Sequence, residues 1–274
     1  MKVIIALFFG MLLFSCTEGV EKKKPVRKPR KTNVLDQKHQ VVDELKLADG
    51  LKIKWFQKGD GPQVKFGDLV KIDYKVRLKD GKEVDGNHLL NRKALPFMVG
   101  FGQQTPGWDI AFNQLRQGDF VEILIPSPLA RGEKGIEGLI PPNADNILVV
   151  RILEIMKPDK VVDGTKVWLV EENRFNKRKF NEKTEVVFHG MASSPTSPIY
   201  VNTFRTNTPL TYRLSDKGLV PGLRKALINS KKADRLFVLV PASEAYKQKG
   251  YLDFVRPNDP IFYNIFVMDV TKIK

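Results

Sequence analysis

The sequence predicts an α+β protein of two tandem domains, each with a mainly antiparallel sheet and one short helix. An internal repeat is the first observation: segments 106–112 and 120–126 recur in diverged form at 221–227 and 235–241, always 115 residues apart. A shared register across a turn, a helix and a strand means that one folding unit is present twice. Length is the second observation, because 274 residues are enough for two domains that each bury a core.

Alternating apolar residues predict the strands of the first unit. The pattern favours strands over 51–56 and 70–78, with a hairpin turn at Asp80-Gly81 after the second. Further strands are expected over 121–125 and 147–155. These segments account for a sheet whose neighbouring strands are mainly antiparallel.

One helix is expected between the strands of each unit. In the first unit, apolar residues at i, i+3, i+4 and i+7 fall on one side of a helix that ends at Gly118: Trp108, Ala111, Phe112 and Leu115. The second unit repeats this segment after Pro221-Gly222. The helix would pack on one face of its sheet.

Composition narrows the class of partner. The chain is 42% hydrophobic and 28% charged, which is ordinary for a globular protein. Its net charge of +15 indicates a solvated basic surface on an envelope protein, with anionic lipid, an acidic cell-wall polymer and nucleic acid as alternatives. Aromatic residues do not interleave with basic patches as in single-strand binders, so no nucleic-acid partner is expected.

The first 15 residues have the pattern of a signal peptide. A lysine precedes an apolar run over 3–14, which is too short to span a bilayer. Cys16 follows and is the only cysteine, so it cannot form a disulfide within the chain. The pattern resembles the lipobox of bacterial lipoproteins, in which this cysteine is lipidated. An ordinary secreted protein with an incidental cysteine is the alternative.

Residues 16–39 are predicted to be a lipid anchor followed by a basic tether. Lysine, arginine and proline dominate this segment, and it lacks the apolar residues to build a core. It serves either as a plain spacer or as a contact with anionic headgroups. The expected location is the cell envelope, at the periplasmic face or the outer membrane.

Several motifs of the first unit match one family in order and spacing. They are Gly59–Pro62, Tyr74, Asp80–Asp85, Phe97–Gly100, Pro106–Trp108 and Gly138–Pro142. The unit resembles FKBP-type peptidyl-prolyl cis-trans isomerases, which implies a curved antiparallel sheet wrapped on one short helix. The expected domains are 40–157 and a degenerate copy over 158–274, in a lipoprotein of a Gram-negative bacterium.

The resemblance implies a proline pocket in the first unit. Trp108 would form its floor, Asp85 would orient the site together with Tyr74, and the backbone N–H of Thr105 would hold a substrate carbonyl. Its remaining walls would be Val84, Leu95, Leu139, Ile140 and Leu148. Where the family carries a pocket tyrosine this unit has Arg131, and several aromatic wall positions are aliphatic, which predicts a wide and polar pocket.

The second unit keeps a different part of the same pattern. Phe188 falls at the Tyr74 position and Leu223 at the floor position. The resemblance makes Tyr246, Phe254, Val255 and Tyr263 its wall, which is more aromatic than that of the first unit. No orienting carboxylate is present, since Tyr200-Val201-Asn202 stands where Val84-Asp85 occurs, and segment 191–198 shows no hairpin turn like Asp80-Gly81. This unit is interpreted as a peptide-binding or scaffolding domain.

The implied reaction is isomerisation of Xaa-Pro bonds in exported polypeptides, without metal or cofactor. The amide barrier of about 18–20 kcal/mol would fall through preferential binding of the twisted amide in a dry pocket. A non-catalytic binding or scaffolding lipoprotein is the alternative. His39, His88 and His189 lack metal-like spacing and are expected to be surface or turn residues.

Overall fold

The computed structural model describes residue 35 and residues 39–89 and 94–273. The predicted signal peptide, Cys16 and nearly all of the tether lie outside these residues. Leu35 and His39 are the described residues of the predicted tether. The Leu35 side chain is 4% exposed and packs with Phe120 and Val149 of the first unit.

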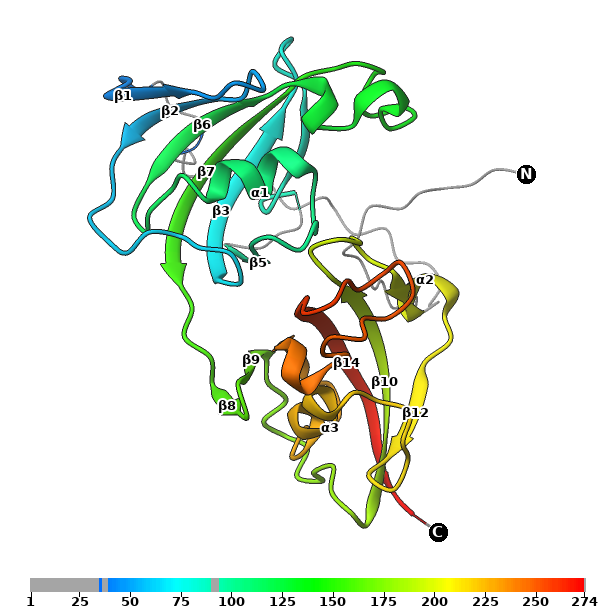
Figure 1. The fold of residues 1–274 in the computed structure, drawn as a ribbon. Helices are drawn as coiled ribbons and strands as arrows, with labels where there is room; N and C mark the ends of the chain where they lie inside the picture. Colours follow the sequence, from blue (N-terminus) through cyan, green and yellow to red (C-terminus); the bar gives the residue numbers. More distant parts are fainter. Residues whose placement is uncertain (1–34, 36–38, 90–93, 274) are drawn as a thin grey trace, which may run out of the picture.

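The first unit is a seven-stranded antiparallel sheet within the described residues. Its strands are β1 (Asp43–Lys46), β2 (Lys52–Gln57), β3 (Leu69–Arg77), β4 (Glu83–Gly86), β5 (Leu95–Met98), β6 (Phe120–Ile125) and β7 (Asn146–Ile155). They follow the order β1-β2-β6-β7-β3-β4, and β5 also pairs with β3. Helix α1 (Pro106–Phe112) lies across one face of the sheet, and the short 3-10 helices η2 (Ser127–Leu129) and η3 (Gly132–Lys134) follow β6 (Figure 1).

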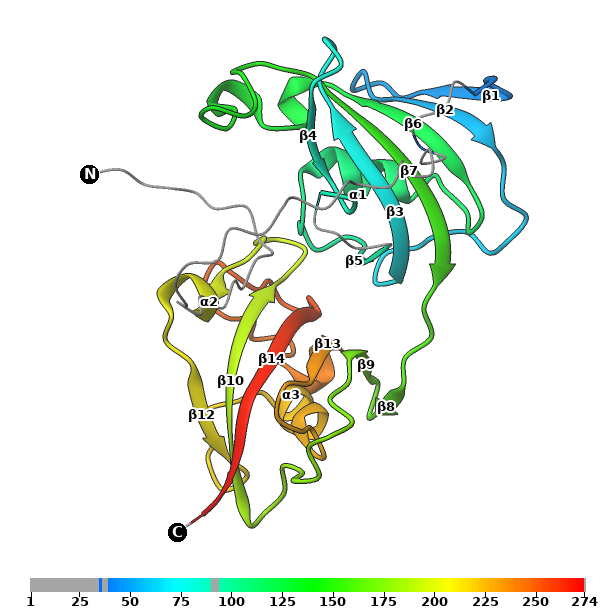
Figure 2. The same cartoon turned by 180° about the vertical axis from the view of Figure 1, so that it is seen from behind.

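The second unit repeats this topology. Its strands are β8 (Lys160–Val162), β9 (Thr165–Glu171), β10 (Thr184–Ser193), β11 (Val201–Asn202), β12 (Leu210–Arg213), β13 (Arg235–Val240) and β14 (Ile261–Lys272). The sheet order β11-β10-β14-β13-β9-β8, with β12 on β10, is the first order read in reverse. Its helices are α2 (Thr203–Thr206), α3 (Pro221–Leu227) and η4 (Ala242–Glu244) (Figure 2). The α+β class and the duplication are therefore confirmed.

The repeated Pro-Gly pair explains how each helix reaches its sheet. Proline occupies the first turn of α1 and of α3, where its missing N–H costs nothing. A Cβ on Gly107 would lie 2.4 Å from Ile125 Cγ2, and one on Gly222 would lie 2.4 Å from Val240 Cγ1. Only glycine permits this approach without a shift of the sheet. Both contacts occur at the same place, 115 residues apart.

Two local predictions differ from the structure. Helix α1 ends at Phe112, and Leu115 follows in a hydrogen-bonded turn with its N–H donated to the Phe112 carbonyl at 3.0 Å. Leu115 is nevertheless fully buried with the helix face. The region after Met191 does form a hairpin, since β10 and β11 pair antiparallel, but its longer loop has no Asp-Gly turn.

His189 was expected at the surface or in a turn, and that prediction is wrong. The side chain lies in β10, is 6% exposed and hydrogen-bonds Thr203 Oγ1 through Nδ1 at 3.0 Å. Its ring stacks on Phe204 with centroids 5.0 Å apart. Burial lowers the pKa of His189, so the neutral imidazole suits this position.

The two units share a buried apolar cluster, called here the inter-unit cluster. Its buried members are Leu69, Met98, Phe101, Trp168, Phe237 and Phe262. Phe101 of the first unit contacts Phe262 of the second, with ring centroids 5.8 Å apart. Trp168 Nε1 donates to the Met156 carbonyl at 3.0 Å. The cluster therefore ties the units together through side chains as well as through the linker between β7 and β8.

No helix in the part of the chain that the structure describes is long and apolar enough to cross a bilayer.

Candidate functional site

Trp108 occupies the centre of the first unit, on the sheet-facing side of α1. Its N–H donates to the Thr105 carbonyl at 3.0 Å in the first turn, and its side chain is 3% exposed. Tyr74 from β3 meets it edge-on at 5.2 Å, and Phe97 from β5 lies 5.5 Å away. Such edge-to-face packing fixes the indole in one orientation.

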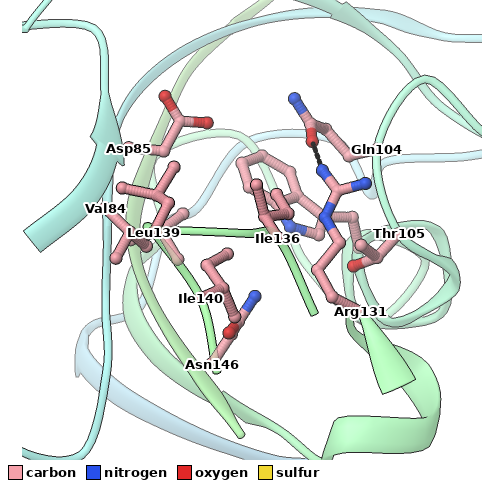
Figure 3. Close-up of a pocket in the computed structure, with 11 residues that line it drawn as sticks. Val84, Asp85, Gln104, Thr105, Arg131, Ile136, Leu139, Ile140 and Asn146 are labelled. Atoms are coloured by element: carbon pink, nitrogen blue, oxygen red, sulfur yellow. Dashed lines mark hydrogen bonds between the residues drawn. The ribbon is translucent and has the colours of Figure 1, made fainter. Parts of the chain in front are cut away.

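Trp108 lines a cavity of about 20 Å³, whose other polar and apolar residues are shown in Figure 3. The cavity is lined by Val76, Val84, Asp85, Gln104, Thr105, Trp108, Arg131, Ile136, Leu139, Ile140 and Asn146. Five of these residues are polar or charged: Asp85, Gln104, Thr105, Arg131 and Asn146. Ile136 and Leu139, from the loop after η3, belong to the apolar part of the lining.

Asp85 and Tyr74 form a hydrogen-bonded pair beside the cavity. Register with β3 places Asp85 opposite Val76. The Asp85 Oδ1 atom accepts the Gly86 N–H at 2.7 Å. Burial, the negative charge of Asp85 and the hydrogen bond between the two side chains all raise the pKa of Tyr74. The phenol is therefore neutral at physiological pH and donates to the carboxylate.

The backbone N–H of Thr105 is a hydrogen-bond donor at the rim of the first cavity. Thr105 is the N-cap of α1, and within the described residues its N–H donates to no other group. The preceding loop is held by Asp109, which accepts the N–H groups of Gly100 and Gly102 at 2.7 and 3.0 Å. Burial raises the pKa of Asp109, and these two hydrogen bonds oppose the shift.

The structure brings together most of the residues predicted for this site. The cavity is lined by Val84, Asp85, Thr105, Trp108, Leu139 and Ile140. Tyr74, Leu95 and Leu148 belong instead to the buried core behind them. Sequence reasoning missed Val76, Ile136 and Asn146 as lining residues. The β-alternation of strand β3 could have identified Val76, whereas Ile136 lies in a loop without periodicity and Asn146 is the first residue of β7.

The second unit has a larger cavity, of about 150 Å³. Leu223 forms its floor where Trp108 stands in the first unit, and the smaller side chain leaves space above it. Four tyrosines line it: Tyr200, Tyr246, Tyr251 and Tyr263. Burial is the main cause that raises the pKa values of Tyr200, Tyr246 and Tyr263, so these hydroxyls are neutral.

Four predicted residues of the second site meet in this cavity. They are Phe188, Leu223, Tyr246 and Tyr263. Phe254 lies next to them, stacked on Tyr200 with ring centroids 5.5 Å apart, and Val255 is buried in a neighbouring cluster. Tyr200 and Tyr251 were missed as lining residues, because the loops that carry them have no repeat partner of the same type. The aromatic character predicted for this unit is present.

Neither cavity contains a nucleophile paired with a base. Within the described part of the chain, no three His, Cys, Asp or Glu side chains gather as metal ligands would. What the first cavity offers is an aromatic floor, a carboxylate and an N–H donor around a small enclosed space. This arrangement suits binding of an apolar ring and the backbone beside it.

Comparison with known proteins gives the family. The family model described as FKBP-type peptidyl-prolyl cis-trans isomerase matches residues 61–153 and again residues 176–268. The chain belongs to this family. Both matches fall within the two sheets described above, so the tandem FKBP-type organisation is shown.

Individual relatives match either one unit or both. FK506-binding protein 1 of Candida glabrata is 39% identical over 112 residues, which are 40% of this chain and 96% of that protein. FK506-binding protein 1 of Saccharomyces cerevisiae is 37% identical over the same shares. The isomerase FKBP10 of Mus musculus is 24% identical over 210 residues, which are 76% of this chain and 35% of that protein.

Solved FKBP structures are also similar. The three FKBP domains of wheat FKBP73 match at 21% identity and a TM-score of 0.41, over 82% of this chain and 97% of that chain. FkpA from Escherichia coli matches at 31% identity and a TM-score of 0.37, over 40% of this chain and 50% of that chain.

Proposed function

We propose that the first FKBP-type unit catalyses cis–trans isomerisation of Xaa-Pro bonds in exported polypeptides. The observation that supports this most directly is the buried Trp108 indole, held by Tyr74 and exposed to a cavity that Asp85 and Thr105 also line. A proline ring on the indole would place its preceding carbonyl near the free Thr105 N–H. The loop after η3, which carries Ile136 and Leu139, would have to move aside to admit the ring.

The chemistry assigned to this pocket is binding of a twisted amide. Rotation about the planar peptide bond has a barrier of about 18–20 kcal/mol. Uncatalysed Xaa-Pro isomerisation therefore takes about tens to hundreds of seconds. Water favours the polar planar amide, so an enclosed aromatic pocket favours the less polar twisted form. Differential binding of that geometry accelerates the rotation, and no proton transfer or cofactor is required.

The second unit is proposed to bind peptide without contributing to catalysis. It lacks a carboxylate at the Asp85 position and has Leu223 in place of the indole floor. Its cavity is wider and has four tyrosines around it. Tyrosine combines a large apolar ring with a hydrogen-bonding tip, which favours contact with extended peptide.

We also propose that the chain is a lipoprotein of the cell envelope, anchored through Cys16. Support comes from the sequence alone: a basic start, a short apolar run and one cysteine at its end. The basic residues that follow would lie next to anionic headgroups. In this arrangement both folded units act on polypeptides that have crossed the inner membrane of a Gram-negative bacterium.

Isomerisation of a short Xaa-Pro peptide by the purified chain tests the first proposal. Wild type is expected to exceed the uncatalysed rate, and Trp108→Ala is expected to lose at least about tenfold, which corresponds to about 1.4 kcal/mol of transition-state binding. Circular dichroism checks that the variant folds. If wild type gives only the background rate, the non-catalytic binding alternative replaces the enzyme.

Fatty-acid labelling in cells tests the anchor. Labelled fatty acid is expected on the wild-type chain and not on Cys16→Ala, because this is the only thiol. Label that persists in the variant contradicts the lipidation of Cys16. An unlabelled wild-type chain recovered in the periplasm supports the secreted alternative.

A further inference from the structure

One cation lines the first cavity, and the proposed isomerisation does not use it. Arg131 precedes η3 and points its guanidinium into the cavity beside Gln104 (Figure 3). Its Nη2 donates to Gln104 Oε1 at 3.3 Å, a long bond to a neutral acceptor. A guanidinium has five N–H donors, so most of its hydrogen-bonding capacity is still available.

Arg131 forms no ion pair with any described residue. Burial lowers the pKa of Arg131, and the charge of Asp85, the acidic residue of the cavity lining, offsets that shift only in part. However, Asp85 lies across the cavity from Arg131 (Figure 3). Its carboxylate accepts the Gly86 N–H and is hydrogen-bonded to Tyr74. Glu133 and Glu137 of the same loop are exposed and do not line the cavity.

Two further polar groups of the cavity are buried without a hydrogen bond. Thr105 Oγ1 and Asn146 Oδ1 have no partner within the described residues, and their side chains are 5% and 4% exposed. Both residues line the same cavity as Arg131. Buried polar atoms are normally satisfied, so unpartnered ones beside a cation indicate a ligand that supplies the missing partners.

The required ligand accepts hydrogen bonds from a guanidinium and also donates to nearby oxygens. A peptide with an acidic side chain does both, because its carboxylate pairs with arginine and its backbone N–H groups reach oxygen acceptors. The carboxylate must lie close to the proline, since Trp108 and Arg131 line one small cavity. The chain's net charge of +15 adds long-range attraction for acidic segments.

We propose that the first cavity selects proline segments with a glutamate or aspartate adjacent to the proline, and that Arg131 is the residue that recognises the carboxylate. This inference rests on the proposed isomerase site, for which it names the substrate class. Arg131 is a specificity residue in this account and has no role in rotating the amide.

Matched peptides test the selection. Six peptides carry Glu, Gln or Lys immediately before or immediately after one proline, in an otherwise identical sequence. NMR exchange spectroscopy measures their isomerisation by the full chain. For the wild type, kcat/KM is expected to be about tenfold higher with Glu than with Gln in at least one position, and lower still with Lys. Half-molar salt should reduce the ratio.

Arg131→Met keeps an unbranched apolar stem and removes the guanidinium with its charge. In this variant the Glu to Gln ratio is expected to fall to about one, because the group that distinguishes a carboxylate from an amide is gone. Lys134→Met is the matched control, because Lys134 is an exposed cation in η3 that does not line the cavity, and it should keep the wild-type ratio. Equal loss with all peptides in Arg131→Met contradicts a specificity role.

The outcomes separate this inference from the isomerase proposal. Isomerisation at equal rates for Glu and Gln overturns the inference and leaves the enzyme intact. If wild type accelerates none of the peptides, the enzyme proposal fails, and NMR chemical-shift titration then measures peptide affinity. Tighter binding of Glu that is lost in Arg131→Met supports the charge selection, whereas equal affinities, or no binding of any peptide, overturn it.

Discussion

At the scale of single residues, the floor position is one clear difference between the two cavities. Trp108 and Leu223 occupy the same place in the repeat, and both are 3% exposed. The indole leaves a cavity of about 20 Å³ above it, whereas the leucine leaves about 150 Å³. In the proposed mechanism a rigid aromatic floor would hold a proline ring in one orientation, which a wide cavity over leucine would not. This contrast supports the proposal that the first unit is the catalytic one.

Tyrosine ionisation is a prediction at this scale. Burial raises the pKa of five of the six tyrosines: Tyr74, Tyr200, Tyr212, Tyr246 and Tyr263. A folded-state pKa above the unfolded value of about 10 adds stability below pH 10, and this stability is lost as the pH rises through the folded value. We therefore expect the free energy of unfolding to fall above pH 10.

Ultraviolet absorbance of tyrosinate measures this directly. Titration of the folded chain to pH 10.5 should ionise only a minority of the six tyrosines, and the rest should ionise when denaturant is added. Ionisation of all six near pH 10 without unfolding would contradict the burial described for both cavities.

At the scale of elements, the Pro-Gly turn is the feature that fixes helix against sheet. A Cβ at Gly107 would meet Ile125 Cγ2 at 2.4 Å and the Leu129 carbonyl at 3.0 Å. Gly107→Ala is therefore expected to lower the free energy of unfolding by about 1–3 kcal/mol through overpacking. Denaturant titration measures the change.

Gly218→Ala is the matched control for that substitution. A Cβ at Gly218 has no atom within 4 Å, so its effect on the free energy of unfolding should stay below about 1 kcal/mol. Equal effects of the two substitutions would contradict the close helix–sheet approach.

Comparison of the predicted and observed elements shows how much of the fold the sequence alone predicts. Alternation predicted strands β2, β3, β6 and β7 to within one residue at most ends, because one face of each is buried. The apolar face of α1 was also correct, although the helix ends three residues before Leu115. Loops without periodicity could not be placed from the sequence: Ile136 lines the first cavity and Tyr251 the second through contacts that no local pattern encodes.

Asp119 and its repeat Asp234 are another element-level feature that the sequence did not reveal. Both side chains are 2% exposed. Asp119 accepts the Trp55 Nε1–H at 3.0 Å and the Gly59 N–H at 2.6 Å, and Asp234 accepts the Asn173 N–H at 3.0 Å. Each carboxylate joins the turn before a strand to a segment some 60 residues earlier in the chain. An aspartate in a turn is ordinarily exposed, so only the folded chain shows this role.

At the scale of the whole molecule, the inter-unit cluster packs the two repeats against each other. Trp168 is 2% exposed at its centre, and Phe101 of the first unit is fully buried in it. The segment that carries Phe101 continues into Gln104 and Thr105, which line the first cavity. Packing between the units therefore also supports the rim of the site.

Trp168→Ala should uncouple the two units. Truncation of a buried tryptophan to alanine lowers the free energy of unfolding by about 3–5 kcal/mol. In this variant the lost contacts include those between the two units. Scanning calorimetry is expected to show one unfolding transition for the wild type and two for the variant. Phe175→Ala, at a residue that is 96% exposed, is the control and should leave the transition unchanged. A single unshifted transition in Trp168→Ala would show that the units are not coupled here.

Assignment of isomerase activity to one of the two units tests the central claim most directly. The measurement compares the isomerisation rate of one Xaa-Pro peptide in the wild-type chain, in Trp108→Leu and in Leu223→Ala. Trp108→Leu gives the first unit the floor residue of the second, and activity is predicted to fall at least about tenfold. Leu223→Ala is predicted to retain the wild-type rate. Full activity in Trp108→Leu, with loss in Leu223→Ala, would contradict the account.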